Sequence, residues 1–399
     1  MIANLTKLVG ASVFGQLIYF CLTPIISRNY TPEQFGTLGS YLVIASILAI
    51  LSSLRYEIAY FRDRKTQELY VFLGLSLILI SSFIFALSVS LFSAFIEGVQ
   101  YPVALILLFI SASLMNFFGQ IATADKLYTE FSVSKFVQFL VQGVAAVILG
   151  AISFDQGLLY SVILSQAIFF LMISRKIKFS FECRQAFVLF LAKLRFCIRG
   201  CLIALIQNCA PHASLLFIFF YLDTESVGLY FFLVQVISTP MTLVRRSLLQ
   251  IVTAEFSGER RYDLKVSLHR MVKSNFFKFG VVLLVLFTLV LLILGERIFG
   301  TIFGSNWRQA GAFSWLVFLY FSLDTFLQPF NLLMSTWGSE KIHAILESAR
   351  LLFVFIVPSV IFIFISPSLL TILLSVFSVM MVFNVLYLYL ILRRHDAPK

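Results

Sequence analysis

Titratable residues in the middle of long apolar runs are the first candidates for chemistry in this sequence. Asp324 has about a dozen apolar-rich residues on either side, and His212 has a similar setting. A charge at the bilayer centre costs about 2.5–3.5 kcal/mol even on the permissive insertion scale, so such residues usually face a cavity and serve function. Carboxyl and imidazole groups can both titrate. We expect Asp324, His212 and Glu57 to couple a proton or cation, and a structural hydrogen-bonding role is the alternative.

Four basic residues lie toward one end of their apolar runs and are candidates for binding an anion. They are Arg55, Lys126, Arg245 and Arg246. The planar guanidinium fork suits phosphate or carboxylate oxygens. Long basic side chains at such positions can instead extend to the lipid headgroups, which is the competing interpretation.

Polar residues recur at helical spacing within several apolar runs and therefore share a helix face. This pattern is followed by Ser113, Asn116, Gln120 and Thr123 in one run, and by Lys135, Gln138 and Gln142 in the next. Hydrogen bonds between helices are worth only about 0.6–2 kcal/mol and explain one or two such residues better than several stripes. The predicted polar cavity lining consists of Asn116, Gln120, Gln138, Gln142, Asn208, Gln235, Gln328 and Asn331.

Motifs for covalent chemistry are absent from the sequence. It contains no G-x-x-x-x-G-K-[ST], H-E-x-x-H or G-x-S-x-G pattern. The five cysteines form no C-x-x-C pair and no metal spacing. We therefore expect no enzymatic activity, no metal and no cofactor.

The elements that carry these residues are expected to be membrane-spanning helices. Hydrophobic residues make up 60% of the chain and charged residues 12%, far from the roughly 25% charged residues of soluble proteins. A helix needs about 20 apolar residues to cross a bilayer. The pattern predicts an all-α integral membrane protein with about twelve spans, at residues 8–27, 36–60, 69–96, 102–124, 135–153, 157–174, 200–222, 228–252, 276–294, 311–335, 350–366 and 368–391.

The positions of the basic residues predict the orientation of the chain. With a cytoplasmic N-terminus, only Arg28, Arg297 and Arg308 of the 30 Lys and Arg residues fall in outer loops. This is the positive-inside pattern. We expect a multi-pass plasma-membrane protein with both termini in the cytoplasm, and the net charge of +11 then indicates orientation and no nucleic-acid partner.

Two six-helix halves are expected on either side of a basic linker. Residues 1–174 and 200–399 form the halves, and residues 175–199 form an amphipathic cytoplasmic segment that we expect to contact anionic lipids. Glu33-x-Phe35-Gly36 before the second predicted span is echoed by Glu225-x-Val227-Gly228 before the eighth. Such parallel repeats are typical of transporters, with the site between them.

Three stretches of the sequence have a familiar pattern, namely "RNYTPEQFGTLGSYLVIASILAILSSLRYEIAY", "ESVGLYFFLVQVISTPMTLV" with "AEFS", and "TIFGSNWRQAG". They resemble bacterial O-antigen and capsule repeat-unit flippases, the polysaccharide-export branch of the multidrug/oligosaccharidyl-lipid/polysaccharide exporter superfamily. The resemblance implies two six-helix bundles of the MATE type around a central cavity that alternates its opening.

The same resemblance implies a cargo and partners. The cargo is an undecaprenyl-diphosphate-linked oligosaccharide, moved from the cytoplasmic to the periplasmic leaflet of the bacterial inner membrane and driven by a proton or sodium gradient. A polysaccharide polymerase and a chain-length regulator are further implied partners. Cationic cavity residues in the family fit Arg55, Lys126, Arg245 and Arg246 here.

Three other functions remain as alternatives at this point. A structural membrane subunit would not require polar stripes in both halves. A drug exporter of the same superfamily would prefer an acidic cavity for its cationic cargo. A membrane polysaccharide polymerase, which is an enzyme, typically carries a large periplasmic loop, whereas the longest predicted outer connection spans only about residues 295 to 310.

Overall fold

Helices make up the regular structure of the part of the chain that the computed structural model describes, residues 2–63, 66–95, 100–178, 182–256, 275–336 and 340–394. This confirms the predicted all-α class. Ten of these helices are long and apolar enough to span a membrane, and a bent pair of helical segments makes an eleventh if it is counted as one span. The protein is therefore a multi-pass membrane protein, with one span fewer among the described residues than the twelve expected.

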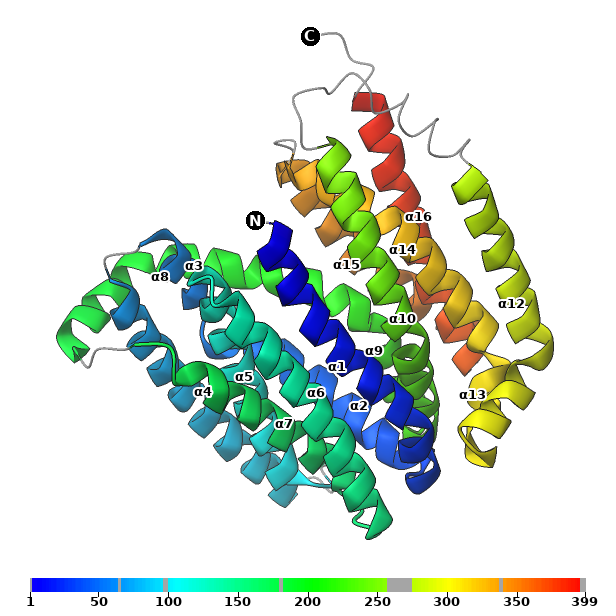
Figure 1. The fold of residues 1–399 in the computed structure, drawn as a ribbon, viewed down its shortest axis with the longest axis horizontal. Coiled ribbons are helices and arrows are strands. Elements are labelled where there is room, and N and C mark those ends of the chain that lie inside the picture. The colour runs from blue at the N-terminus through cyan, green and yellow to red at the C-terminus, as the bar shows by residue number, and fades with distance from the viewer. Residues whose placement is uncertain are drawn as a thin grey trace. The chain divides into compact units, whose positions relative to one another are not determined.

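The chain divides into two compact units, residues Met1–Cys209 and Ala210–Lys399. The division falls ten residues beyond the end of the basic segment predicted as a linker at 175–199, so that segment lies in the first unit. The helices of the first unit are α1 (Ile2–Asn29), α2 (Pro32–Ser52), α3 (Tyr56–Arg62), α4 (Gln67–Phe95), α5 (Pro102–Ala124), α6 (Tyr128–Ala151), α7 (Gly157–Ser174) and α8 (Cys183–Cys209) (Figure 1).

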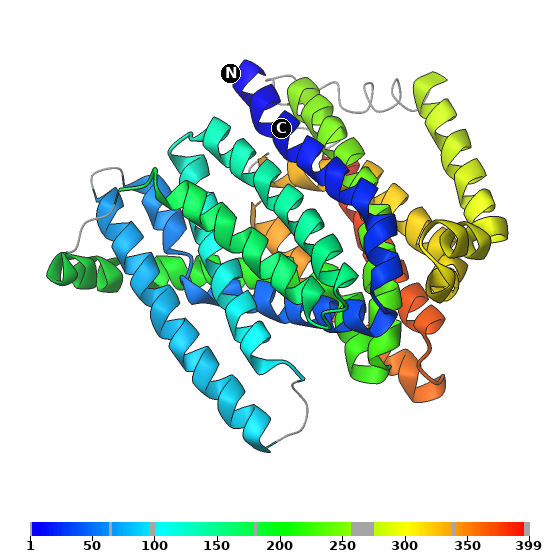
Figure 2. The same ribbon diagram turned by 60° about the horizontal axis from the view of Figure 1, so that its bottom comes forward.

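A close helix pair, α1 with α6, organises the first unit, and α7 packs against α6 and α5 (Figure 2). The approach of α1 to α6 depends on Gly15, because a Cβ there would lie 2.9 Å from the Cα of Phe136. At the far end of the pair, the Tyr30 hydroxyl donates a hydrogen bond of 2.9 Å to the Ala146 carbonyl. Small residues at helix crossings are the usual means of close packing in membranes, where no hydrophobic effect drives association.

The second unit contains a short 3-10 turn (Ala210–His212) and helices that run to the end of the described chain. These helices are α9 (Ala213–Tyr221), α10 (Thr224–Phe256), α12 (Asn275–Ile302), α13 (Arg308–Ala312), α14 (Ser314–Thr336), α15 (Glu340–Phe364) and α16 (Leu369–Arg394). Trp307, which is fully buried, packs on Phe232 of α10 with ring centroids 3.9 Å apart. A Cβ on Gly295 would lie 2.4 Å from the Gly311 carbonyl oxygen, so α12 and α13 touch through their backbones.

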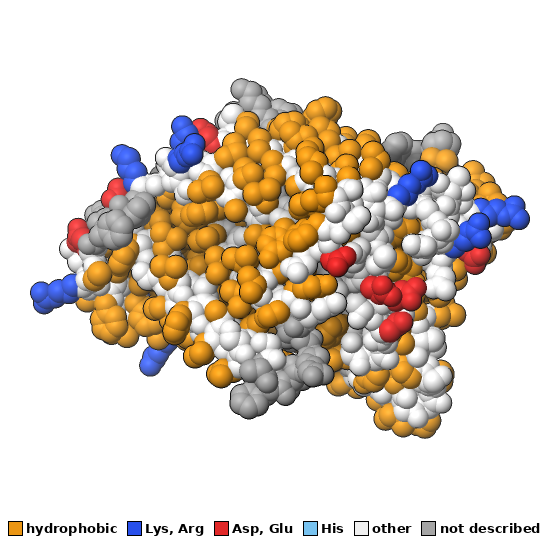
Figure 3. All heavy atoms as spheres, turned by 90° about the horizontal axis from the view of Figure 1, so that it is seen from below, with side chains coloured by type: hydrophobic (Ala, Val, Ile, Leu, Met, Phe, Trp, Pro, Cys, Tyr) orange, Lys and Arg blue, Asp and Glu red, His pale blue; other side chains and the backbone are white. Residues whose placement is uncertain are grey.

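Large apolar side chains remain exposed along the helices, as a lipid-facing surface requires. Phe83 on α4 is 72% exposed, and Ile293 and Ile363 are each 76% exposed. Hydrophobic side chains cover wide areas of the face seen in Figure 3. In water such patches would mark an interaction surface, and here they fit contact with hydrocarbon.

Two predicted spans were wrong as continuous helices. The predicted span 36–60 is broken between α2 and α3, because Leu54 and Arg55 adopt the left-handed conformation, with φ of 45° and 60°. The predicted span 200–222 is interrupted by the turn at Ala210–His212. Proline lacks an N–H and disfavours helical geometry in the residue before it, so Pro211 accounts for that interruption.

A third boundary also differs from the prediction. The span expected to begin at residue 350 belongs to α15, which begins at Glu340. The residues between these positions, which include Glu347, are therefore helical and enter the apolar part of the unit.

Candidate functional site

Asp324 lies near the middle of α14 and is held by groups from two other helices of the second unit. Its side chain is largely buried and lies 3.5 Å from a guanidinium nitrogen of Arg245 on α10. Asn384 of α16 donates a hydrogen bond of 2.9 Å to the other carboxyl oxygen. The contacts of the Asp324 carboxylate therefore connect α14 with α10 and α16.

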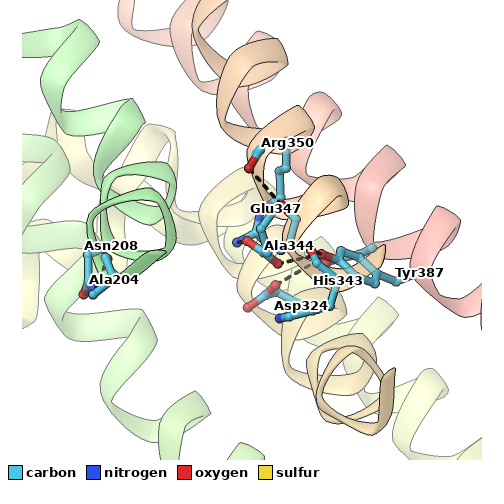
Figure 4. Close-up of polar contacts among 10 residues, drawn as sticks. Ala204, Asn208, Asp324, His343, Ala344, Glu347, Arg350 and Tyr387 are labelled. Atoms are coloured by element: carbon cyan, nitrogen blue, oxygen red, sulfur yellow. Dashed lines mark hydrogen bonds and ion pairs between the residues drawn. The ribbon is translucent and has the colours of Figure 1, made fainter. Parts of the chain in front are cut away.

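A second charged cluster, which the sequence analysis missed, lies between α15 and α16. Glu347 is 6% exposed and forms an ion pair with Arg350, one turn along the same helix. The hydroxyl of Tyr387, on α16, donates to Glu347 at 2.8 Å and also contacts the His343 carbonyl oxygen at 3.4 Å. Figure 4 shows this cluster beside Asp324, with its members on neighbouring helices of one unit.

The sequence contained a signal for this cluster. Glu347 and Arg350 are three residues apart, the spacing that places an acid and a base on one helix face. The predicted span began at residue 350, which left Glu347 in a loop. A charged residue in a loop is not a candidate for a site inside the membrane.

Arg55 and Glu57 form a small polar cluster at the break between α2 and α3. The Arg55 Nε lies 3.4 Å from one Glu57 oxygen, and the Ser53 hydroxyl donates to the other at 2.8 Å. Burial raises the pKa of the Glu57 carboxyl, whereas the Ser53 hydrogen bond and the Arg55 guanidinium act in the opposite direction. The structure therefore places Arg55 against Glu57, where the two charges compensate each other.

The short helix α3 is fixed by two tyrosine hydroxyls. Tyr56 donates at 2.7 Å to the Phe190 carbonyl of α8, and Tyr60 donates to both carboxyl oxygens of Asp125 at 2.8 and 2.7 Å. Asp125 and Lys126 form the turn between α5 and α6, where Lys126 is exposed and has a φ of 59°. Lys126 is thus an exposed cation at the turn between α5 and α6.

A cavity of about 150 Å³ opens between α5, α6 and α7 within the first unit. Two of the predicted lining residues, Asn116 and Gln120, lie on its α5 wall and are exposed. The other walls include Thr123, Phe131, Lys135 and Phe169. Asn116, Gln120 and Thr123, which share one face of α5, therefore lie together on one wall of this cavity.

Gln138 and Gln142 of α6 lie apart from the wall of this cavity. Gln138 is buried and accepts a hydrogen bond of 2.9 Å from the Lys135 ammonium, while its amide contacts the Met115 sulfur at 3.2 Å. Gln142 is half-buried. Lys135, noted in the sequence only as part of a stripe, is the cation that the structure brings to the predicted polar residues.

The remaining predicted site residues are more scattered. Asn208 is exposed and donates to the Ala204 carbonyl one turn earlier on its own helix, at 2.7 Å (Figure 4). His212 ends the 3-10 turn and caps α9, and Gln235 is half-buried on α10. The side chains of Arg246, Gln328 and Asn331 lie outside the described residues.

A second cavity, of about 320 Å³, lies at the opposite ends of the first unit's helices. Its polar lining comes from Glu33, Gln34 and Thr37 at the start of α2, with Tyr101 and Asp155 from the loops. No group of three or more His, Cys, Asp or Glu residues within the described ranges could hold a metal ion.

Comparison with known proteins adds the family. The sequence matches the polysaccharide biosynthesis protein family over residues 25–312. The chain belongs to this family. The matched region contains the cavity wall on α5 and Arg245 on α10, and it ends just before α14, so Asp324 lies outside it. A search of curated protein sequences finds no match.

Solved structures show which fold this family member adopts. The lipid II flippase MurJ in an inward closed conformation aligns with a TM-score of 0.69 and 14% identity over 96% of this chain and 86% of that one. An inward-facing multidrug resistance MATE transporter of the MOP superfamily aligns with a TM-score of 0.67 and 13% identity over 96% and 98% of the two chains. The MATE-like fold predicted from the sequence is therefore confirmed, and these similar folds belong to transporters and flippases.

Proposed function

We propose that the protein is a flippase for undecaprenyl-diphosphate-linked oligosaccharide repeat units of O-antigen, capsule or exopolysaccharide. It moves them from the cytoplasmic to the periplasmic leaflet of the bacterial inner membrane by alternating access. The observation that carries this proposal is the match to the polysaccharide biosynthesis family in a chain with a transporter fold. The proposed orientation has both termini in the cytoplasm, and the distribution of basic residues supports it.

The chemistry of the cargo fits the polar groups of the chain. A diphosphate and a sugar chain cannot cross hydrocarbon, whereas a polyprenyl tail can remain in the lipid, so the protein must supply a polar, cationic path and break no bond. Lys126, Arg245 and Arg246 are the proposed cations for the diphosphate, and Arg55 belongs to the same set once its contact with Glu57 opens.

Ion coupling is proposed at Asp324, with His212 and Glu57 as further candidates. The support for Asp324 is its burial beside Arg245 and Asn384, since a change in its charge would alter both contacts. The driving ion is a proton or sodium. Anionic lipids at the basic segment of α8, and a polysaccharide polymerase with its chain-length regulator, are the proposed partners.

Deletion of the gene tests the proposal. We expect loss of surface polysaccharide and accumulation of lipid-linked repeat units that face the cytoplasm, measured by accessibility of the sugars to a membrane-impermeant label in oriented vesicles. Complementation by Arg245→Ala with Arg246→Ala should fail at normal membrane levels. Accumulation of single repeat units on the outer leaflet would instead indicate the polymerase reaction, and unchanged polysaccharide with lost drug tolerance would indicate a drug exporter.

A further inference from the structure

Lys135 occupies a cavity that none of the proposed cationic residues enters. Its side chain extends from α6 into the space of about 150 Å³ that α5, α6 and α7 enclose. The ammonium donates to Gln138 at 2.9 Å, lies 3.8 Å from the Met115 sulfur and sits 4.6 Å from the centre of the Phe169 ring. These contacts fix the position of a cation at the wall of an open cavity.

The opposite wall presents hydrogen-bond donors at a matching depth. Asn116, Gln120 and Thr123 follow one face of α5 up to its end at Ala124. At a rise of 1.5 Å per residue, Asn116 lies about 12 Å from that end, and Lys135 lies about 10 Å from the start of α6. Because α5 runs into α6 through a short turn, these distances are measured from the same side, and the ammonium lies level with the inner part of the polar wall.

Exposed amides on this wall are unsuited to hydrocarbon. Asn116 and Gln120 are both exposed in the structure, and a polar group that faces lipid without a partner is unfavourable. The neighbouring helix α4 shows what a lipid-facing surface looks like, with Leu79 and Phe83 about 70% exposed. The polar wall therefore faces water or a polar ligand.

The available groups define the class of ligand. An ammonium, two carboxamides and a hydroxyl can all donate hydrogen bonds, and lysine binds phosphate as a point charge. A ligand with several negatively charged oxygens can accept from the ammonium and both carboxamides at once, whereas the Thr123 hydroxyl already donates to the Gln120 carbonyl at 2.7 Å. Lys126, exposed at the turn that joins α5 to α6, adds positive charge three residues beyond Thr123 of the cavity lining.

We propose that Lys135, with Asn116 and Gln120, forms an oxyanion-binding site of the first unit. This inference rests on the proposed function, because the oxyanion is carried by the cargo, either as the diphosphate bridge or as the carboxylate of an acidic sugar. The site holds the anionic group at the depth of Lys135, between the surface cation at Lys126 and the middle of the bundle.

Equilibrium binding to the purified full-length protein in lipid nanodiscs tests the site. The probes are farnesyl diphosphate, a short soluble analogue of the lipid diphosphate, and sodium glucuronate, with farnesol as the uncharged reference. Lys135→Met should weaken binding of one anionic probe at least tenfold, while Lys135→Arg keeps it within about threefold. Lys278→Met is the matched control, since Lys278 is an exposed lysine on α12 of the second unit, outside the cavity, and the affinity of this variant should equal that of the wild type.

The two probes distinguish the sources of the oxyanion. A loss confined to farnesyl diphosphate assigns the site to the bridge, and a loss confined to glucuronate assigns it to an acidic sugar. Gln120→Leu keeps the lysine and removes one donor, so it should weaken the same probe severalfold even if Lys135→Met fails to fold. The proposal is overturned if the wild type binds neither anion, or if Lys135→Met and Gln120→Leu bind both within twofold of the wild type.

These outcomes are separate from the test of the proposed function. If the wild type and both cavity variants bind the anionic probes equally, the proposed site is rejected. The deletion phenotype then still tests whether the protein is a flippase. A deletion strain with normal polysaccharide would remove the flippase proposal and leave the binding measurement intact.

Discussion

The ion pair of Asp324 and Arg245 offers a direct test of how the second unit is held together. Asp324→Asn keeps the shape of the side chain and an oxygen that can still accept from Asn384, so it removes only the charge. Arg245→Met removes the opposite charge and keeps most of the apolar stem. The double variant lacks both charges, so a thermodynamic cycle isolates their interaction.

The magnitude follows from the geometry. Two unit charges about 4 Å apart attract by about 4 kcal/mol at an effective dielectric constant of 20, and the two charged groups lie 3.5 Å apart in the structure. The side chains are 23% and 13% exposed, so solvent and side-chain entropy reduce the attraction. We expect a coupling energy of about 1–2 kcal/mol.

Thermal midpoints of the purified protein, recorded in one detergent at one scan rate, measure this coupling. For a unit of this size, 1 kcal/mol shifts the midpoint by about 2–4 °C. If the effects of the two single variants on the midpoint are added, the double variant should melt about 2–8 °C above that sum. Glu225→Gln with Arg245→Met is the control pair, because Glu225 is exposed near the far end of α10 and the two losses should add. Additive losses for Asp324→Asn and Arg245→Met would refute the conclusion that this pair stabilises the fold.

Four further predictions follow from the same structure. Asp324→Asn should make transport in inverted vesicles insensitive to collapse of the proton or sodium gradient, and an unchanged sensitivity would return Asp324 to a packing role. Gly15→Leu should lower the thermal midpoint and the amount of folded protein, since its Cβ would meet the Phe136 backbone, whereas Gly119→Ala should be tolerated because the nearest atoms lie 3.6 Å away. Burial raises the pKa of Glu57 above its ordinary value of 4.5, so its protonated form favours the fold at low pH and this contribution is lost as the pH rises through the raised value. Glu57→Gln should therefore be more stable than the wild type at pH 8 and lose that advantage as the pH falls below 4.5. Tyr60→Phe should cost about 1–2 kcal/mol by removing the donor to Asp125, and a midpoint equal to that of the wild type would show that α3 needs no such anchor.

One polar wall of the described cavity could be predicted because polar residues are rare in this chain. In a sequence with 60% hydrophobic residues, Asn116 and Gln120 stand out, and their spacing of four residues places them on one face. The structure brings both to one cavity wall. The same reasoning singled out Asp324 as an ionisable group near the middle of a span, which needs protein or water around it, and the structure shows this side chain buried among protein groups.

The sequence alone determined that the chain is a helical membrane protein and which helix faces are polar. Hydropathy acts over about 20 neighbouring residues, and helical periodicity relates residues three or four apart, so both can be read locally. The order of the spans followed from the same local signals.

Only the tertiary structure decided the partners of the polar residues. The pairing of Asp324 with Arg245 and Asn384, and of Glu347 with Tyr387, joins residues 40 to 79 positions apart on different helices. The break at Leu54 and Arg55 also depends on contacts with α8 and α5 that hold α3 in place. Such contacts depend on how the helices pack, and no local pattern specifies that packing.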